Sequence, residues 1–364
     1  MDSIKQSVPK NKRLLSLDVL RGITIAGMIL VNNGGPVNFA PLEHSKWNGL
    51  SLADIVFPFF LFMVGISTYL SLRKYDFHWS VALVRKITKR TLLILLIGWG
   101  IYWFNACCQG DFLPFSHLRI PGVLQRIALC YGIVSVLAVS INHKWFPHIA
   151  VGLLVIYTLI LIVGNGYACN GSNVLAIVDH AVFGPAHLYH KSPIDPEGLL
   201  GTIPSIAHTL LGFIAGEILM ERTSLKEKML RLLLYGFLLS GLGFLFQYGL
   251  PLNKRIWSPT FVLFTCGLAS SLLACLIGII DIKDKKCWTP FFESFGINPL
   301  FLYIFSELLA SFFFNFHIKN ALYGVILSVV SYKYITSLIY AILFVLLNWI
   351  VGYPLYKKRI YIKL

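Results

Sequence analysis

His44 is the residue of this sequence best suited to acyl transfer. It lies in the segment Glu-His-Ser-Lys-Trp-Asn-Gly-Leu, residues 43–50, between two strongly apolar stretches. Histidine titrates near neutral pH, so it can take a proton from an attacking amine or carry an acyl group itself. The alternative interpretation is an exposed loop histidine without a catalytic role, and the spacing of the residues leaves both open.

Three further polar side chains lie within or at the ends of apolar stretches, where such groups are costly and therefore candidates for function. Asn32 ends the first stretch close to the His44 segment, where it either stabilises a developing oxyanion or caps a helix. Asp54 and Glu307 are carboxylates in apolar surroundings. Each can orient a histidine, hold an ammonium group, or simply hydrogen bond to a neighbouring helix.

Two arginines also fall inside apolar stretches. Arg21 lies eleven residues before Asn32, which places it about 16 Å away along a helix. It therefore either meets a phosphate that enters from the inner side or is neutralised by Asp18 three residues earlier. Arg126 lies near the start of another apolar stretch and requires an anionic partner at a similar depth.

The segment Asp195-Pro-Glu-Gly198 combines acidic side chains with a helix-start pattern. Proline after an aspartate cap is a common first helical residue, so structure alone explains the segment, and contact with substrate is the alternative. His180, His187 and His190 follow no metal-ligand spacing. We predict no metal site.

These residues must be positioned by a membrane domain. Apolar residues make up 57% of the 364 positions and charged residues 13%, with a mean hydropathy of +0.73, whereas soluble domains carry about 25% charged residues. A membrane span requires about 20 apolar residues. The sequence predicts an all-α polytopic membrane protein of about ten spans, near residues 14–33, 50–72, 87–104, 120–141, 147–164, 199–220, 231–249, 258–281, 295–316 and 334–356.

The charge pattern predicts the orientation of these spans. Most of the 31 Lys and Arg residues fall in alternate connections that the positive-inside rule places in the cytoplasm, together with both termini. We expect a cytoplasmic tail over 1–13, a membrane domain over 14–364, and external loops near 34–49 and 166–198, the second without helical periodicity. The net charge of +15 is then explained by membrane lipids and anionic metabolites rather than nucleic acid. The absence of internal repeats is evidence against an inverted-repeat transporter.

Several segments together resemble one family, the heparan-alpha-glucosaminide N-acetyltransferases and their bacterial homologues. The similar segments occur in order from about residue 13 to the C-terminus: Ser16-Leu-Asp-Val-Leu-Arg-Gly-Ile23, Val31-Asn-Asn-Gly-Gly35, His44-Ser-Lys-Trp-Asn-Gly-Leu-Ser-Leu-Ala-Asp-Ile-Val-Phe-Pro58, Arg119-Ile-Pro-Gly-Val-Leu-Gln-Arg126, His187-Leu-Tyr189, Asp195-Pro-Glu-Gly-Leu-Leu-Gly-Thr202, Asn253-Lys254 with Trp257-Ser258, and Asn298 through Glu307.

The resemblance implies transfer of acetyl from cytosolic acetyl-CoA to the amine of a glucosamine-type sugar on the far side of the membrane. It implies that His44 is catalytic, as a base or as an acetyl carrier, and that Asn32 assists it. We assign Arg21, Arg126, Asn48 and Asp54 to the acetyl-CoA site, with basic residues between Arg73 and Arg90 as alternatives to Arg21. We assign Glu307, Asp195, Glu197, His187, Lys254 and Trp257 to the acceptor.

Two other functions stay open at this point. A membrane O-acyltransferase would acetylate a hydroxyl of an envelope glycan with the same residues, and a proton-coupled transporter would use His44 and Glu307 as a relay. The short N-terminus, without the luminal domain of the lysosomal relatives, predicts a bacterial inner membrane with the site open to the periplasm. There Cys169 is expected to pair with Cys107 or Cys108. The resemblance also predicts a homodimer.

Overall fold

The computed structural model describes residues 14–190 and 192–362, and the described part of the chain is helical without strands. The predicted cytoplasmic tail at 1–13 lies outside the described residues. Nine described helices are long and apolar enough to cross a membrane: α1 (Leu15–Asn32), α2 (Leu52–Leu72), α3 (Val81–Cys108), α4 (Val123–Ser140), α5 (Phe146–Val163), α7 (Thr202–Met220), α8 (Leu225–Phe246), α9 (Pro259–Leu276, extended by a π-helical turn Ile277–Ile282) and α13 (Lys333–Lys357). The all-α prediction is confirmed, and the chain is an integral membrane protein.

A bent pair of helices is long and apolar enough to count as a tenth span when its two parts are taken together. α10 (Thr289–Ile297) and α11 (Pro299–Asn315) meet at an angle of 85°. Pro299 has no N–H and disfavours helical geometry at the residue before it, so the helix ends at Asn298. The Asn298 side chain instead bonds the backbone of Ile360 and Ile362, at 2.8 Å each. The prediction of one continuous span over 295–316 was wrong at this point, because the span begins earlier and bends.

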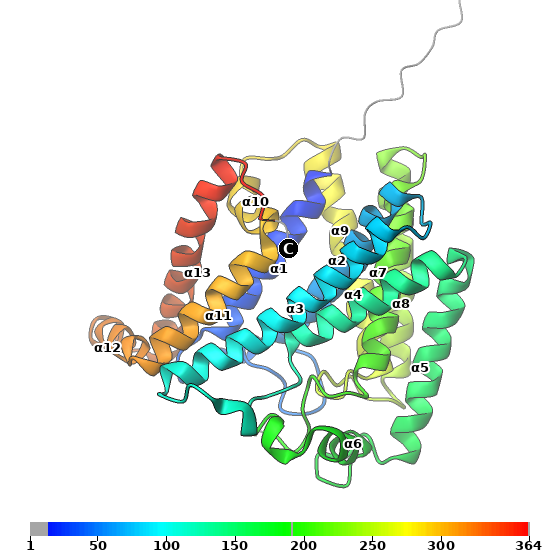
Figure 1. Cartoon of the computed structure of the whole chain (residues 1–364). Helices are drawn as coiled ribbons and strands as arrows, with labels where there is room; N and C mark the ends of the chain where they lie inside the picture. The colour runs from blue at the N-terminus through cyan, green and yellow to red at the C-terminus, as the bar shows by residue number, and fades with distance from the viewer. Residues whose placement is uncertain (1–13, 191, 363–364) are drawn as a thin grey trace, which may run out of the picture.

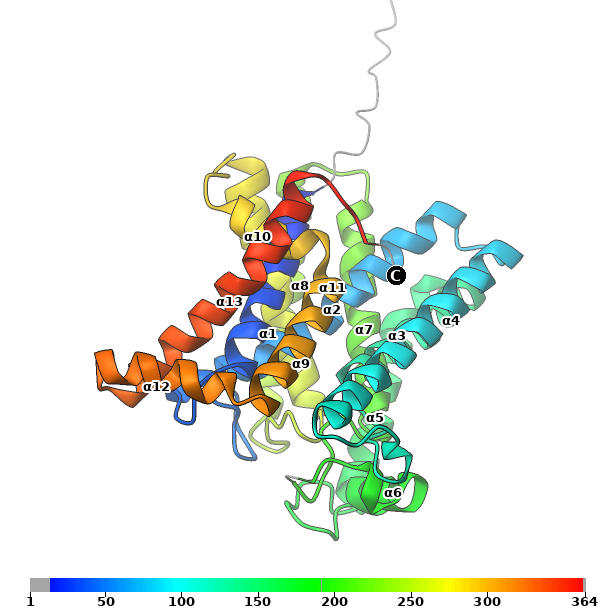
Figure 2. The same ribbon diagram turned by 60° about the vertical axis from the view of Figure 1, so that its left-hand side comes forward.

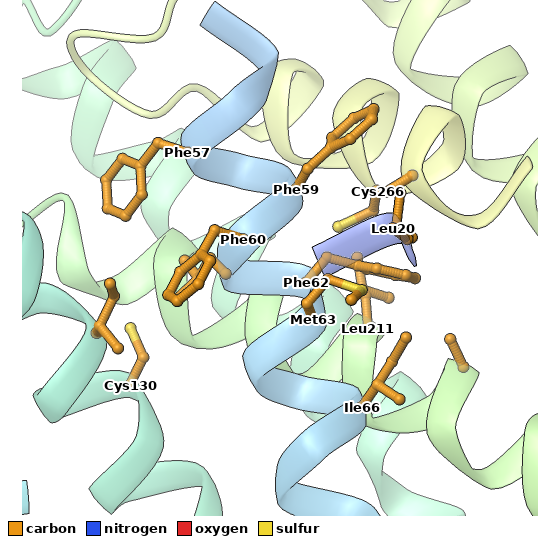
Figure 3. Packing of buried hydrophobic residues seen from close by; sticks show 14 of the residues in the cluster. Leu20, Phe57, Phe59, Phe60, Phe62, Met63, Ile66, Cys130, Leu211 and Cys266 are labelled. Atoms are coloured by element: carbon orange, nitrogen blue, oxygen red, sulfur yellow. The ribbon is translucent and has the colours of Figure 1, made fainter. Parts of the chain in front are cut away.

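The central helices approach one another at glycines. On α2, a Cβ added to Gly65 would lie 2.2 Å from the Thr209 carbonyl oxygen of α7, and one added to Gly212 of α7 would lie 2.1 Å from that of Phe62. Backbones this close require residues without a side chain, as is common between membrane helices. Figure 3 shows α2 crossing this region, with Phe57, Phe60 and Ile66 among the buried side chains around it. α2 is therefore tightly packed against α7 at the centre of the bundle.

Two short helices accompany the spans. α6 (Val174–Phe183) lies inside the predicted external loop 166–198, where we expected no helix. It begins because the Asn173 side chain accepts the Leu175 N–H at 2.9 Å, and it buries Leu175 and Ala176. α12 (Ile318–Val330) joins α11 to α13 beside their ends (Figure 2).

The two ends of the helical domain lie at one side of the bundle. Figure 1 shows the start of α1 and the end of α13 near the top, with α6 at the opposite end. Ten spans, with the bent pair counted as one, return the chain to the side where it began. The assignment of that side to the cytoplasm stays a prediction from charge.

Candidate active site

His44 is held by a carboxylate at the start of α2. Its Nδ1 lies 2.9 Å from Oδ1 of Asp54. The other oxygen, Oδ2, accepts hydrogen bonds from the Ser51 N–H and hydroxyl, at 3.1 and 3.0 Å, and from the Ser45 N–H at 3.1 Å. Asp54 is buried, whereas 45% of the His44 side chain is exposed. The residue that caps α2 therefore also fixes the orientation of the imidazole.

Lys254 approaches the same pair from the loop between α8 and α9. Its Nζ lies 3.1 Å from His44 Nδ1 and 3.4 Å from Asp54 Oδ1. Burial lowers the pKa of Lys254, while the carboxylates of Asp54 and Glu197 oppose that shift. In the tautomer whose Nδ1–H donates to Asp54, the Lys254 ammonium pairs with the same carboxylate, and Nε2 is the ring nitrogen that remains for chemistry.

Asn48 connects the two loops that carry His44 and Lys254. Its Oδ1 accepts a hydrogen bond from Asn253 Nδ2 at 3.1 Å, and the neighbouring Gly49 N–H donates to the Leu252 carbonyl at 2.8 Å. Gly49 has φ +114°, a conformation that glycine adopts without strain. Asn48 therefore lies next to the site and holds its loops in register, rather than forming the cavity wall.

Asn32 and Glu307 meet at another part of the wall. Asn32 ends α1, and its Nδ2 lies 3.4 Å from Oε1 of Glu307 on α11. Among the described residues no lysine or arginine forms an ion pair with Glu307: Arg119 pairs with Asp195 and Glu197, and Lys254 pairs with Asp54. Glu307 is thus a carboxylate at a cavity wall whose hydrogen-bond partners, the Asn32 amide and the Tyr303 hydroxyl, are both neutral.

Arg119 binds the acidic segment that the sequence singled out. Its guanidinium contacts both Asp195 oxygens, at 2.6 and 3.2 Å, and Glu197 Oε2 at 2.7 Å, and it donates to the Tyr102 hydroxyl at 3.1 Å. Tyr189 covers its face, with the cation 4.9 Å from the ring centre. Asp195 also accepts hydrogen bonds from the backbone N–H groups of Tyr189 and Glu197, so each of its two oxygens has two donors.

These groups surround one cavity of about 580 Å³ between α1, α2, α3, α4 and α11. Its polar wall combines residues that were predicted for the site, namely Asn32, His44, Asp54, Glu197, Lys254 and Glu307, with seven that were not singled out, namely Ser45, Tyr102, Arg119, Gln125, Tyr189, Arg255 and Tyr303. Arg119 does lie in one of the similar segments, seven residues before Arg126, and that position was the available signal. Asp195 stands behind this wall as the anchor of Arg119.

Four other predicted residues lie away from the cavity wall. Arg126 donates to the carbonyls of Pro196 and Gly198, at 2.8 Å each, so backbone dipoles replace the anionic partner that was expected. Trp257 is buried against Phe57, with ring centres 5.1 Å apart. The remaining two are His187, whose Nδ1 is 2.7 Å from the Leu118 carbonyl, and Arg21, which lies in the first half of α1, far from the cavity end of that helix.

Asp179 of α6 supports the acidic segment from behind. Its Oδ1 accepts the Leu199 N–H at 2.8 Å, while its buried Oδ2 has no hydrogen-bond partner. Burial raises the pKa of Asp179 to about 6; the Leu199 N–H opposes that shift and Asp195 adds to it. Because the pKa lies above the ordinary value, ionisation of this carboxyl opposes folding as the pH rises through that interval.

Asp179→Asn should therefore raise the melting temperature at neutral pH. The gain should shrink as the pH falls below about 6, since the wild-type carboxyl is then protonated in the folded state and the penalty disappears. Thermal unfolding of the purified protein across this pH range measures the difference. Asp76→Asn removes the same charge at an exposed site and should show no such pH-dependent gain; an equal gain in both variants would contradict the assignment.

No three histidine, cysteine, aspartate or glutamate side chains gather into a metal-binding group within residues 14–190 and 192–362. All seven cysteines lie in these ranges, and each is a free thiol. The expected disulfide from Cys169 to Cys107 or Cys108 is thus not formed. Cys107 and Cys108 belong to the last turn of α3, whereas Cys169 lies in the loop between α5 and α6.

The sequence is similar to those of known proteins. The family model for the catalytic domain of heparan-alpha-glucosaminide N-acetyltransferase matches residues 13–250. The human and mouse proteins named heparan-alpha-glucosaminide N-acetyltransferase are each 29% identical over 412 and 411 aligned residues, which cover 97% of this chain. The chain spans 60% of the length of these relatives. The matched family segment contains His44, Asn32 and Arg119 but ends before Lys254 and Glu307.

Proposed function

This chain belongs to the heparan-alpha-glucosaminide N-acetyltransferase family, and we propose that it transfers an acetyl group across the membrane, from acetyl-CoA to the amine of a glucosamine-type sugar. The observation that carries the proposal is the pair of His44 and Asp54 at the wall of a cavity between helices. The pair provides an oriented base, which is what removal of a proton from an attacking amine requires.

His44 acts through Nε2. The amine nitrogen attacks the thioester carbonyl, the new N–C bond forms, and the amine proton passes to Nε2 while Asp54 holds Nδ1–H. As the C–S bond breaks, the imidazolium returns that proton to the thiolate of coenzyme A. Between these two steps the carbonyl oxygen of the thioester is negatively charged, and Asn32 Nδ2 donates a hydrogen bond to it. A route through an acetyl-histidine uses the same nitrogen and gives the same products.

Glu307 supports an amine rather than a hydroxyl as the acceptor. Its carboxylate lines the cavity without a cationic partner among the described residues, whereas Arg119 neutralises Glu197 and Lys254 lies beside Asp54. Burying an uncompensated carboxylate is costly unless a cation meets it. The ammonium group of an amino sugar supplies that cation, and a sugar hydroxyl does not. Transfer of one ammonium proton to the Glu307 carboxylate then leaves the neutral amine that attacks the thioester.

The direction of transfer follows from the predicted topology. The cavity lies toward the end of the bundle that the charge pattern places outside, and the basic connections lie at the opposite end. Acetyl-CoA thus enters from the cytosol and the sugar from outside, which in a bacterial inner membrane is the periplasm.

Sealed vesicles test the proposal directly. With acetyl-CoA on one side and glucosamine on the other, N-acetylglucosamine should appear on the glucosamine side, and only when both substrates are present. Glucose, which has a hydroxyl in place of the amine, should give little product, since it lacks the ammonium group for Glu307. Efficient acetylation of glucose would favour the O-acyltransferase alternative, and uptake of glucosamine without acetylation would overturn the enzymatic interpretation.

A further inference from the structure

Two cations on α3 face the interior of the bundle without a carboxylate partner. Lys86 and Arg90 are one helical turn apart and both are partly buried. Lys86 Nζ donates to the Ser71 hydroxyl of α2 at 2.8 Å, and the Arg90 guanidinium stacks 4.6 Å from the ring centre of Tyr131. Arg90 Nε is buried without a hydrogen-bond partner. No carboxylate in the described part of the chain forms an ion pair with either residue.

Arg90, and polar residues at the same level of α1 and α2, lie on the same helix faces as residues that line the cavity. On α3, Arg90 precedes the cavity residue Ile101 by eleven residues; on α2, Ser67 follows Val56 by eleven; and on α1, Arg21 precedes Asn32 by eleven. Eleven residues are about three turns, so each pair lies on one face with about 16 Å of axial separation. Arg21 donates to the Ser67 hydroxyl at 2.7 Å, which joins the α1 and α2 faces at this level.

α1, α2 and α3 therefore each have a polar or cationic side chain about 16 Å along the helix from a residue that lines the cavity. Lys86 lies one turn further from the cavity than Arg90. A ligand that reaches from this level to His44 needs a long neutral arm and an anionic head. The phosphorylated nucleotide and the pantetheine arm of coenzyme A have these properties.

We infer that Lys86 and Arg90 bind the phosphate groups of the acyl donor's nucleotide. The inference rests on the proposed function for the identity of the donor. Phosphate oxygens complete the hydrogen bonds that Arg90 Nε lacks and supply the negative charge that the Lys86–Arg90 pair lacks. Arg21 lies at the same level as Arg90, one turn nearer the cavity than Lys86. It contacts the Asp18 carboxylate at 3.2 Å, so we assign it to the pantetheine arm rather than to the phosphates.

Neighbouring basic residues provide matched controls. Arg85 and Lys89 each precede one of the pair by a single residue and therefore point about 100° away around α3. Both are exposed, and they line a shallow groove with Trp79 on the outer face of the helix. Phosphates of membrane lipids have the same chemistry as those of the donor. They would contact this outer groove before they contact the Lys86–Arg90 pair.

The test compares donors with and without phosphates. In vesicles of phosphatidylcholine, Lys86→Met and Arg90→Met should each raise KM for acetyl-CoA by about 10- to 100-fold, the usual effect of losing a charge-assisted hydrogen bond. KM and kcat for S-acetylpantetheine, which has no nucleotide, should stay unchanged. Arg85→Met and Lys89→Met should leave both donors unaffected.

Three results would overturn the inference. An equal loss with S-acetylpantetheine would indicate a structural role, and an equal loss in Arg85→Met would indicate a general charge effect. A loss that appears only when anionic lipid is present would assign the site to lipid headgroups. Binding of adenosine 3′,5′-bisphosphate, measured by calorimetry, needs no turnover. Weakened binding in Lys86→Met would uphold the phosphate site even if the wild-type protein transferred no acetyl group, so the two proposals fail separately.

Discussion

Replacing His44 by alanine should lower kcat for acetyl transfer by about 10²- to 10⁴-fold, the usual contribution of a positioned general base. Methyl replaces the imidazole, so the amine must lose its proton to water, and Asp54 loses the group that it orients. Initial rates of N-acetylglucosamine formation at saturating acetyl-CoA measure the effect. KM for acetyl-CoA should change little, because His44 contacts the reacting atoms rather than the nucleotide.

The matched control for His44 is His117. It is an exposed histidine outside the cavity, paired with Asp111 at 3.1 Å, and His117→Ala should retain the wild-type rate. A folded His44→Ala protein that turned over at the wild-type rate would remove His44 from the mechanism. With labelled acetyl-CoA and no acceptor, label on His44 of the wild-type protein would select the acetyl-histidine route over direct transfer.

Asn32→Ala should lower kcat by about 10²- to 10³-fold, the typical cost of losing one oxyanion donor. The Asn32 amide forms one long hydrogen bond of 3.4 Å to Glu307, so its N–H group is poorly used in the ground state. A group that gains most of its interaction in the transition state affects kcat more than KM. Steady-state kinetics over both substrates separate the two constants.

The adjacent asparagine is the control for this variant. Asn33 is buried, and its Nδ2 donates to the Ile29 carbonyl of its own helix at 2.9 Å, away from the cavity wall. Asn33→Ala should keep kcat, with gel filtration used to confirm that both variants are folded. If Asn32→Ala instead raised KM for glucosamine at constant kcat, Asn32 would serve to position Glu307 and the acceptor, and the oxyanion role would be excluded.

The partners of Arg119 and Arg126 could not be predicted from the sequence. Both arginines fall in one short similar segment, and only Arg126 was assigned to the site. In the fold, Arg119 precedes α4 and reaches the Asp195 and Glu197 carboxylates, while Arg126 inside α4 points at backbone carbonyls. The chemistry of the side chain is the same in both. The partners of the side chain depend on how residues 195–198 pack beside α4, which no local pattern encodes.

The sequence by itself determined the membrane character and the positions of most spans. Both depend on about twenty consecutive residues, because the length of an apolar stretch must match the thickness of the bilayer core. Asn298-Pro299 is also a local pattern, and it could have predicted the break between α10 and α11.

The tertiary structure alone decided which side chains share the cavity. Lys254 meets His44 across 210 residues of sequence, and Glu307 meets Asn32 across 275. Contacts at that separation are set by the packing of whole helices, such as the glycine contacts between α2 and α7. Small shifts in that packing move a side chain from the cavity to a neighbouring helix, so the spacing of residues in the sequence could suggest candidates but could not bring them together.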